Sequence, residues 1–176
     1  MAFDRDKFKA MVHYICWKTT DNPSSLGATK LNKVCWLADF LAYYHFEHAI
    51  TDASYVKRPF GPVPQAIVGV LRELDAEGAV LNSTKLFHGY PQIQFRATCE
   101  PDISAFDGAE MKLIDRMTKY VTEEHTAQSI SDLSHDHIWK AASDGEEMPY
   151  FTIFAKPAPI TEMDREWAMQ ELETIG

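Results

Sequence analysis

The sequence predicts an α+β fold that is predominantly α, a single helical domain with one small antiparallel β-hairpin in a winged-helix-like position. Apolar residues recur at helical spacing in several separate stretches. Residues 93–98 instead alternate apolar and polar side chains, as a half-buried strand does. The length of 176 residues and the hydrophobic content of 45% fit one domain, residues 1–176, with its own core.

The first predicted element is a helix over about residues 4–19. Its N-terminal end carries Asp4 and Asp6, whose carboxylates suit the positive end of a helix dipole. The residues that mark its buried face are Phe8, Met11, Val12, Ile15 and Cys16. The sequence DNPSSLG then ends the helix.

The central predicted helix covers residues 29–48, TKLNKVCWLADFLAYYHFEH, with Thr29 as its N-cap. One broad face gathers Leu31, Val34, Leu37, Ala38, Leu41 and His45. The opposite face should be polar, yet Trp36, Phe40 and Tyr43 stand among its charged residues. Such a helix is either buried on most sides or presents aromatic rings to another molecule.

Residues 50–60 read as a short extended link, and residues 61–64, GPVP, as a turn that delivers proline to the first turn of a third helix. That helix runs to about residue 77, and Gly78 is placed to end it in the left-handed conformation. Val80 and Leu81 begin a strand, residues 93–97 form its partner, and HGYP supplies the turn. A helix that runs into a hairpin is the second half of a winged-helix arrangement.

The last third is predicted to be helical with loops. Ser104 is the expected N-cap of a helix over residues 105–121, and two shorter helices follow Thr126 and Ser134. Residues 150–154 could form one short strand within a proline-punctuated loop. Residues 156–176 are expected to hold a loop and a final helix that starts with the capping-box pair Thr161 and Asp164.

Composition and charge narrow the class of protein. No apolar stretch is long enough to span a bilayer and no signal peptide is evident, so we expect a cytoplasmic protein without a membrane partner. Residues 1–60 carry 8 Lys and Arg against 6 Asp and Glu, whereas residues 101–176 carry 6 against 16. The acidic third would repel nucleic acid and speed encounter with a basic partner, or it would serve solubility alone.

The residues that could carry chemistry do not form a recognisable catalytic motif. The three cysteines are an odd, unpaired set that fits buried thiols better than a nucleophile. His135 and His137 are metal-ligand types, but residues two apart on a helix point in different directions. We therefore predict a protein that is not an enzyme and needs no metal or cofactor, with a small metal-dependent hydrolase as a minor alternative.

The winged-helix hint raises DNA binding as an alternative function. A recognition helix and wing need several lysines and arginines. The predicted third helix offers Arg72 against Glu73, Asp75 and Glu77, and the hairpin offers only Lys85 and Arg96. Nucleic acid is therefore an improbable partner on charge grounds.

Three segments together resemble the Panacea domain, the SocA-like antitoxin domain of bacteria and their phages. They are KLNKVCWLADFLAYYHFEHAI, RPFGPVPQAI after Tyr55, and LSHDHIWKAASDGEEMPY, so the resemblance covers about residues 5–155. The matching motif residues are Lys30, Leu31, Asp39, Phe40, Gly61, Pro62, Val63, Trp139, Pro149 and Tyr150. The resemblance implies a mostly helical domain with a small hairpin and no catalytic residues.

The resemblance also implies a function. Members of this family are antitoxins of two-component systems that neutralise protein toxins by direct contact, and some are thought to deliver the toxin to a protease. We therefore expect an antitoxin whose partner is a cognate protein toxin, with a host protease or operator DNA as the alternatives. The residues predicted to contact the partner are Lys33, Trp36, Asp39, Phe40 and Tyr43. Alternatively, the rings pack beneath the C-terminal helices.

Overall fold

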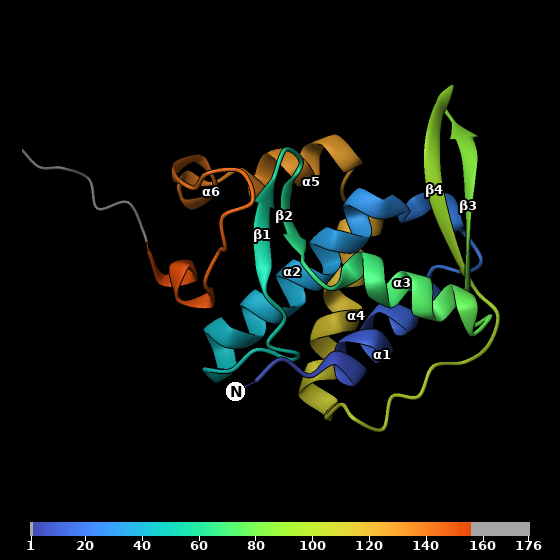
Figure 1. Ribbon diagram of the computed structural model, residues 1–176, viewed down its shortest axis with the longest axis horizontal. Helices are drawn as coiled ribbons and strands as arrows, with labels where there is room; N and C mark the ends of the chain where they lie inside the picture. The colour runs from blue at the N-terminus through green and yellow to red at the C-terminus, as the bar shows by residue number, and fades with distance from the viewer. Residues whose placement is uncertain (1, 156–176) are drawn as a thin grey trace, which may run out of the picture.

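The computed structural model describes residues 2–155. In this range the chain folds into six α-helices, two short 3₁₀ helices and two antiparallel two-stranded sheets (Figure 1). The predicted class, α+β and predominantly α, is confirmed, although the sequence suggested one hairpin and the structure has two. The central element is α2 (Gly27–Phe46), which packs against α1 (Arg5–Lys18), α4 (Gly108–Glu123) and α5 (Ala127–Ser134).

The first helix, α1, forms as predicted. Asp4 is its N-cap and accepts a hydrogen bond from the backbone N–H of Lys7 at 2.9 Å. The predicted apolar face, from Phe8 to Cys16, is fully buried against the centre of the domain. Burial raises the pKa of the Cys16 thiol to about 12, which leaves that thiol inert rather than nucleophilic at neutral pH.

Helix α2 begins two residues earlier than predicted, so Thr29 lies inside it and is not its N-cap. The preceding turn, η1 (Pro23–Ser25), leads straight into the helix at Gly27. At the other end Glu47 adopts a left-handed conformation with φ 62° and ends the helix. Because both the apolar and the polar side of α2 are buried along its middle, the first of the two predicted possibilities holds: the helix is enclosed on most sides.

The prolines of the GPVP segment lie in a strand, which corrects the prediction of a helix-starting turn. β1 (Tyr55–Arg58) pairs with β2 (Gly61–Pro64), with Tyr55 opposite Pro64 and Lys57 opposite Pro62. Backbone groups of Tyr55 and Lys57 bond instead to residues 145–148 on the other side of β1. Pro62 and Pro64 therefore lie opposite residues whose backbone groups point away from β2. No hydrogen bond between β1 and β2 is lost because proline lacks an N–H.

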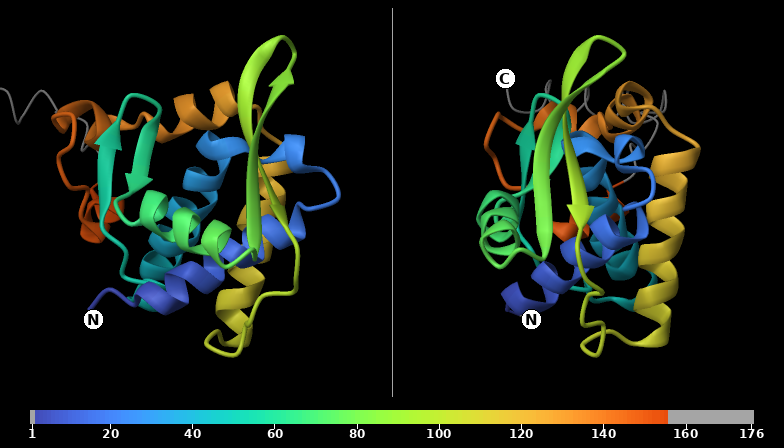
Figure 2. Two further views of the ribbon diagram at one scale, coloured as in Figure 1. Left: turned by 45° about the vertical axis from the view of Figure 1, so that its right-hand side comes forward. Right: turned by 90° about the vertical axis from the view of Figure 1, so that its right-hand side faces the viewer.

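The third helix and the predicted wing follow directly. α3 (Ile67–Ala76) is shorter than expected because residues 61–64 belong to β2, and Gly78 ends it with φ 70° as predicted. β3 (Val80–Phe87) and β4 (Tyr90–Ala97) form a long antiparallel hairpin. Both views of Figure 2 show this hairpin rising beyond the helices, attached at its base. The predicted helix-then-hairpin arrangement is therefore confirmed.

The caps of the later helices differ in part from the prediction. α4 is capped by Asp107, whose capping box with Glu110 replaces the expected cap at Ser104. Thr126 caps α5 as predicted, but α6 (His137–Ala141) is capped by Asp136 and not by Ser134, which is the last residue of α5. Residues 150–154 form a 3₁₀ helix, η2 (Tyr150–Phe154), where a strand was expected. The predicted helix at Thr161 lies outside the described residues.

Candidate functional site

Lys33 connects α2 to the β1–β2 hairpin from the interior of the protein. Its side chain is buried, and its Nζ donates a hydrogen bond to the carbonyl oxygen of Pro62 at 3.2 Å. Burial lowers the pKa of Lys33 to about 7, far below the ordinary value of 10.5. This lysine, which the sequence predicts to touch a partner, joins two elements of the fold.

Gly61 completes the same junction. Its φ of 103° suits glycine, and a β-carbon built there would lie 2.4 Å from Lys33 Nζ and 2.2 Å from Ser134 Oγ. The Ser134 hydroxyl donates to the carbonyl of Ser131 at 2.7 Å at the C-terminal end of α5. Three elements, α2, β2 and α5, thus meet at one glycine. The Gly-Pro-Val motif therefore has a structural explanation, because only glycine fits where these elements meet.

Asp39 forms a second buried junction further along α2, six residues after Lys33. One oxygen accepts from the backbone N–H of Thr51 at 2.8 Å, and the other accepts from the Thr51 and Tyr55 hydroxyls, both at 2.7 Å. Burial raises the pKa of Asp39 to about 6, and the hydrogen bonds from Thr51 and Tyr55 oppose that rise. The carboxylate therefore ties α2 to the segment that leads into β1.

Aromatic rings pack around these two junctions. Phe40 lies 4.8 Å from the ring of Tyr150 and 5.6 Å from that of Tyr55, measured between centroids. Tyr43 stacks on Tyr150 at 5.6 Å, and Trp36 lies 5.6 Å from Phe40. The Tyr150 hydroxyl donates to the carbonyl of Ala53 at 2.6 Å. This aromatic cluster joins η2, after Pro149, to the side of α2.

The structure brings the predicted contact residues together, but inside the protein. Lys33, Trp36, Asp39 and Phe40 are buried, and Tyr43 is half-buried against η2. The alternative stated for the rings, packing beneath C-terminal segments, describes their position. Contact between these side chains and a partner stays a prediction, and the surface that the described residues present is formed by others.

The remaining motif residues have distinct places. Lys30 donates to the carbonyl of Thr122 at 3.2 Å and so joins α2 to α4, whereas Leu31 is fully buried. Val63 packs partly buried against the core from β2. Trp139 Nε1 donates a hydrogen bond to the carbonyl oxygen of Arg58 at 3.1 Å. The Lys57 ammonium lies over the Trp139 ring, 4.2 Å from the ring centroid, in a cation–π contact.

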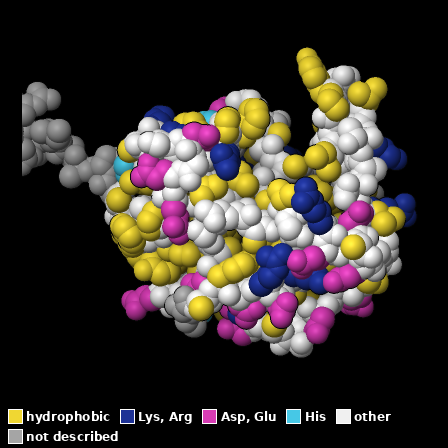
Figure 3. All heavy atoms as spheres, viewed as in Figure 1, with side chains coloured by type: hydrophobic (Ala, Val, Ile, Leu, Met, Phe, Trp, Pro, Cys, Tyr) yellow, Lys and Arg dark blue, Asp and Glu magenta, His cyan; other side chains and the backbone are white. Residues whose placement is uncertain are grey.

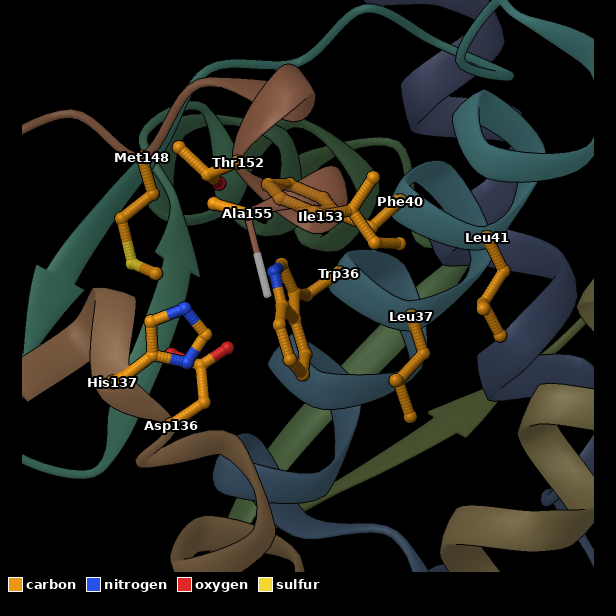
Figure 4. Close-up of a pocket in the computed structure, with 10 residues that line it drawn as sticks. All are labelled: Trp36, Leu37, Phe40, Leu41, Asp136, His137, Met148, Thr152, Ile153 and Ala155. Atoms are coloured by element: carbon orange, nitrogen blue, oxygen red, sulfur yellow. The ribbon is translucent and has the colours of Figure 1, made fainter. Parts of the chain in front are cut away.

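The two histidines that could have suggested a metal site point to different surroundings. His135 stacks on the Trp139 ring at 3.7 Å, and burial with the nearby charge of Lys33 lowers its pKa. His137 lines a cavity of about 220 Å³ beside Trp36 and Met148 (Figure 4). Within residues 2–155, no three His, Cys, Asp or Glu side chains gather as ligands for one ion.

The cavity beside α2 is mainly apolar. Figure 4 shows the indole of Trp36 on one wall, His137 and Met148 on another, and Ile153 above. Among the described residues, Trp36 Nε1 finds no hydrogen-bond acceptor. The polar residues of its lining are Asp136, His137 and Thr152.

A surface that the sequence analysis did not single out is the outer half of the β3–β4 hairpin. Its exposed apolar residues are Leu86, Phe87, Tyr90 and Ile93, and Leu81 is a further exposed apolar residue near the base. Single exposed apolar side chains are ordinary, but several on one projecting element mark a contact surface. The sequence does show apolar residues on both sides of the HGYP turn. It does not show that the hairpin extends beyond the rest of the domain and leaves these residues exposed.

Comparison with known proteins gives one match. A family model described as antitoxin SocA-like, Panacea domain, matches residues 31–140, which is well over half of the chain. No curated protein and no solved structure matches the chain. The matched range spans both junctions on α2, both hairpins and α5.

Proposed function

We propose that this chain, which belongs to the SocA-like antitoxin family defined by the Panacea domain, neutralises a cognate protein toxin by binding it directly. An antitoxin family implies a toxin partner in general. The observation that supports direct binding is the exposed apolar surface of the β3–β4 hairpin. Apolar side chains held in water on a projecting element gain free energy when a partner protein covers them.

We further propose that the chain acts without catalysing a reaction. The arrangement that most resembles a nucleophile with its base is Ser134 beside Lys33, whose lowered pKa would let the amine accept a proton near neutral pH. Both side chains are buried, and Ser134 Oγ already donates to Ser131. A substrate could not reach them without separating α2, β2 and α5.

The structure gives less support to operator DNA as the partner. α3 uses Val70 and Leu74 for the core, and its Glu73 pairs with Arg5 of α1. Glu77, just after α3, pairs with Lys9. A helix flanked by carboxylates and held against another helix is poorly suited to lie along phosphates.

Within the described residues no helix is long and apolar enough to cross a membrane.

Co-expression tests the proposal. The product of the neighbouring gene should stop growth when it is expressed alone and allow growth when this chain is present, and the two purified proteins should form a stable complex. Growth arrest that this chain does not relieve, or relief without complex formation, would contradict direct neutralisation. A toxin that disappears from cells only when this chain is present would instead support delivery to a protease.

A further inference from the structure

The β3–β4 hairpin has one apolar face that begins in the core and continues into solvent. Residues opposite one another in an antiparallel pair share a face, so Asn82 with Phe95, Thr84 with Ile93, and Leu86 with Pro91 lie on the same side as Val80 with Ala97. At the base Val80 and Phe95 are buried, whereas Ile93 is 45% and Leu86 77% exposed. The apolar face therefore extends beyond the part of the hairpin that packs against the rest of the domain.

A groove runs along the inner part of this face. It has a volume of about 310 Å³ and lies between the hairpin, α3 and the start of α2. Its apolar walls include Ile93, Phe95, Leu71 and Val68, and Val68 is 57% exposed. Figure 3 shows hydrophobic side chains on the hairpin and beside it on the body. We call this feature, together with Leu86 at the tip, the hairpin groove.

The hairpin groove is lined by one cation and by no carboxylate, although the protein is acidic. Residues 78–99 contain no Asp or Glu, although the chain has 26 of them. Arg72 lines the groove together with uncharged side chains, whereas Lys85 and Arg96 lie on the opposite face of the hairpin. Within residues 2–155 none of these three makes an ion pair, whereas the neighbouring Glu73 is already paired with Arg5 of α1.

From this combination we propose that the hairpin groove binds a segment of the toxin that presents at least two apolar side chains flanked by Asp or Glu. The inference rests on the proposed function and names the surface and the chemistry that would recognise it. Apolar anchors that enter a groove usually carry most of the binding energy, and charges at the rim select the partner and speed its approach. Arg72 beside Val68 and Ile93, in a lining without Asp or Glu, suits such a segment better than a phosphate backbone, which needs more charge and offers nothing for the apolar walls.

Replacing an apolar residue of the groove tests the anchors. Ile93→Glu and Val68→Asp change exposed side chains, so we expect folding to be retained, and thermal unfolding checks this. Ile103→Glu is a matched control, because Ile103 is 43% exposed on a loop away from the hairpin. With the neighbouring gene's product as the probe, each groove variant should raise Kd at least tenfold and lose growth protection, while the control stays within about twofold of wild type.

Reversing charge at two places tests the sign of the partner. The variant Arg72→Glu, in the groove, and the variant Arg116→Glu, on α4, change the net charge equally. An acidic segment in the groove should make association at low salt about tenfold slower for the groove variant than for the α4 variant, and added salt should reduce this difference. Equal rates, or a faster groove variant, would overturn the proposal.

The outcomes separate the two proposals. If the wild-type chain neither binds nor neutralises the neighbouring product, the proposed function fails. If it does both and Ile93→Glu, Val68→Asp and Ile103→Glu behave alike, direct neutralisation stands and the hairpin groove is rejected as its site. A mobility shift of the upstream DNA that is lost in Arg72→Glu, with toxin binding unchanged, would also overturn the proposal by assigning this cation to nucleic acid.

Discussion

Gly61 and Ser134 lie 73 positions apart in the sequence, yet a single methyl group would not fit between them. A β-carbon on Gly61 would approach Ser134 Oγ to 2.2 Å, and the backbone there has φ 103°. Two independent reasons therefore require glycine, one from the chain's own geometry and one from the packing of α5.

The first prediction separates these two reasons. Gly89 also has a positive φ, of 83°, but no atom would lie within 4 Å of an added β-carbon. Gly89→Ala should lower the free energy of unfolding by about 1–2 kcal/mol through backbone strain alone. Gly61→Ala should cost a further 1–3 kcal/mol or so because the methyl group overpacks the junction. Urea unfolding of the two variants measures the difference, and equal losses would show that α5 can move aside.

The second prediction concerns Lys33 and alkaline pH. Its pKa is about 7 when folded and near 10.5 when unfolded, so the unfolded chain binds more protons between these values and stability rises with pH. Lys33→Met should remove this dependence, and the wild type should gain up to about 1.4 kcal/mol per pH unit relative to the variant. Unfolding curves from pH 7 to 9 test it; parallel curves would mean that the ammonium is solvated.

The third prediction concerns Asp39 and acid pH. Because its pKa is about 6 in the folded protein and 3.8 ordinarily, this carboxyl should reduce stability as pH rises from about 4 to 6. Tyr55→Phe removes one donor, should cost about 1–3 kcal/mol near pH 7, and should extend the decline to higher pH. Tyr150→Phe is the control, since that hydroxyl serves the carbonyl of Ala53 and not a carboxylate. A Tyr55→Phe profile identical in shape to wild type would contradict this role.

The fourth prediction asks what the aromatic residues of α2 do. Phe40 is buried against Tyr55 and Tyr150, so Phe40→Ala should destabilise the fold by about 3–5 kcal/mol. Phe60→Ala, at a ring that is 65% exposed, should change stability by no more than about 0.5 kcal/mol. Denaturation and toxin binding should be measured on both. A stable Phe40→Ala that fails to bind toxin would restore the original expectation of direct contact.

Periodicity predicted the helices well because their buried faces are local patterns. The face of α1 and the apolar stripe of α3 were visible as letters at helical spacing. One error came from a partner that is distant in the sequence. Pro62 and Pro64 looked like the start of a helix, because nothing nearby reveals that residues 145–148 occupy the other edge of β1.

The candidate site shows the same division. Lys33 and Asp39 stood on the polar side of a predicted helix, and charged residues there are normally exposed. Their burial depends on acceptors and donors at Pro62, Thr51 and Tyr55, which only the tertiary fold supplies. The family motif includes Asp39, but a motif does not distinguish residues that maintain the fold from residues that meet a partner.

The hydrogen bonds between β1 and residues 145–148 have a consequence for the order of synthesis. During synthesis, Tyr55 and Lys57 are made some 90 residues before residues 145–148, to which their backbone groups bond. Until those residues are made, one edge of β1 has no partner and Phe40 on α2 lacks its contact with Tyr150. Cleavage within residues 143–155 would return the finished protein to that unfinished condition. Residues 145–150 therefore protect a strand edge and an aromatic ring that were made much earlier in synthesis.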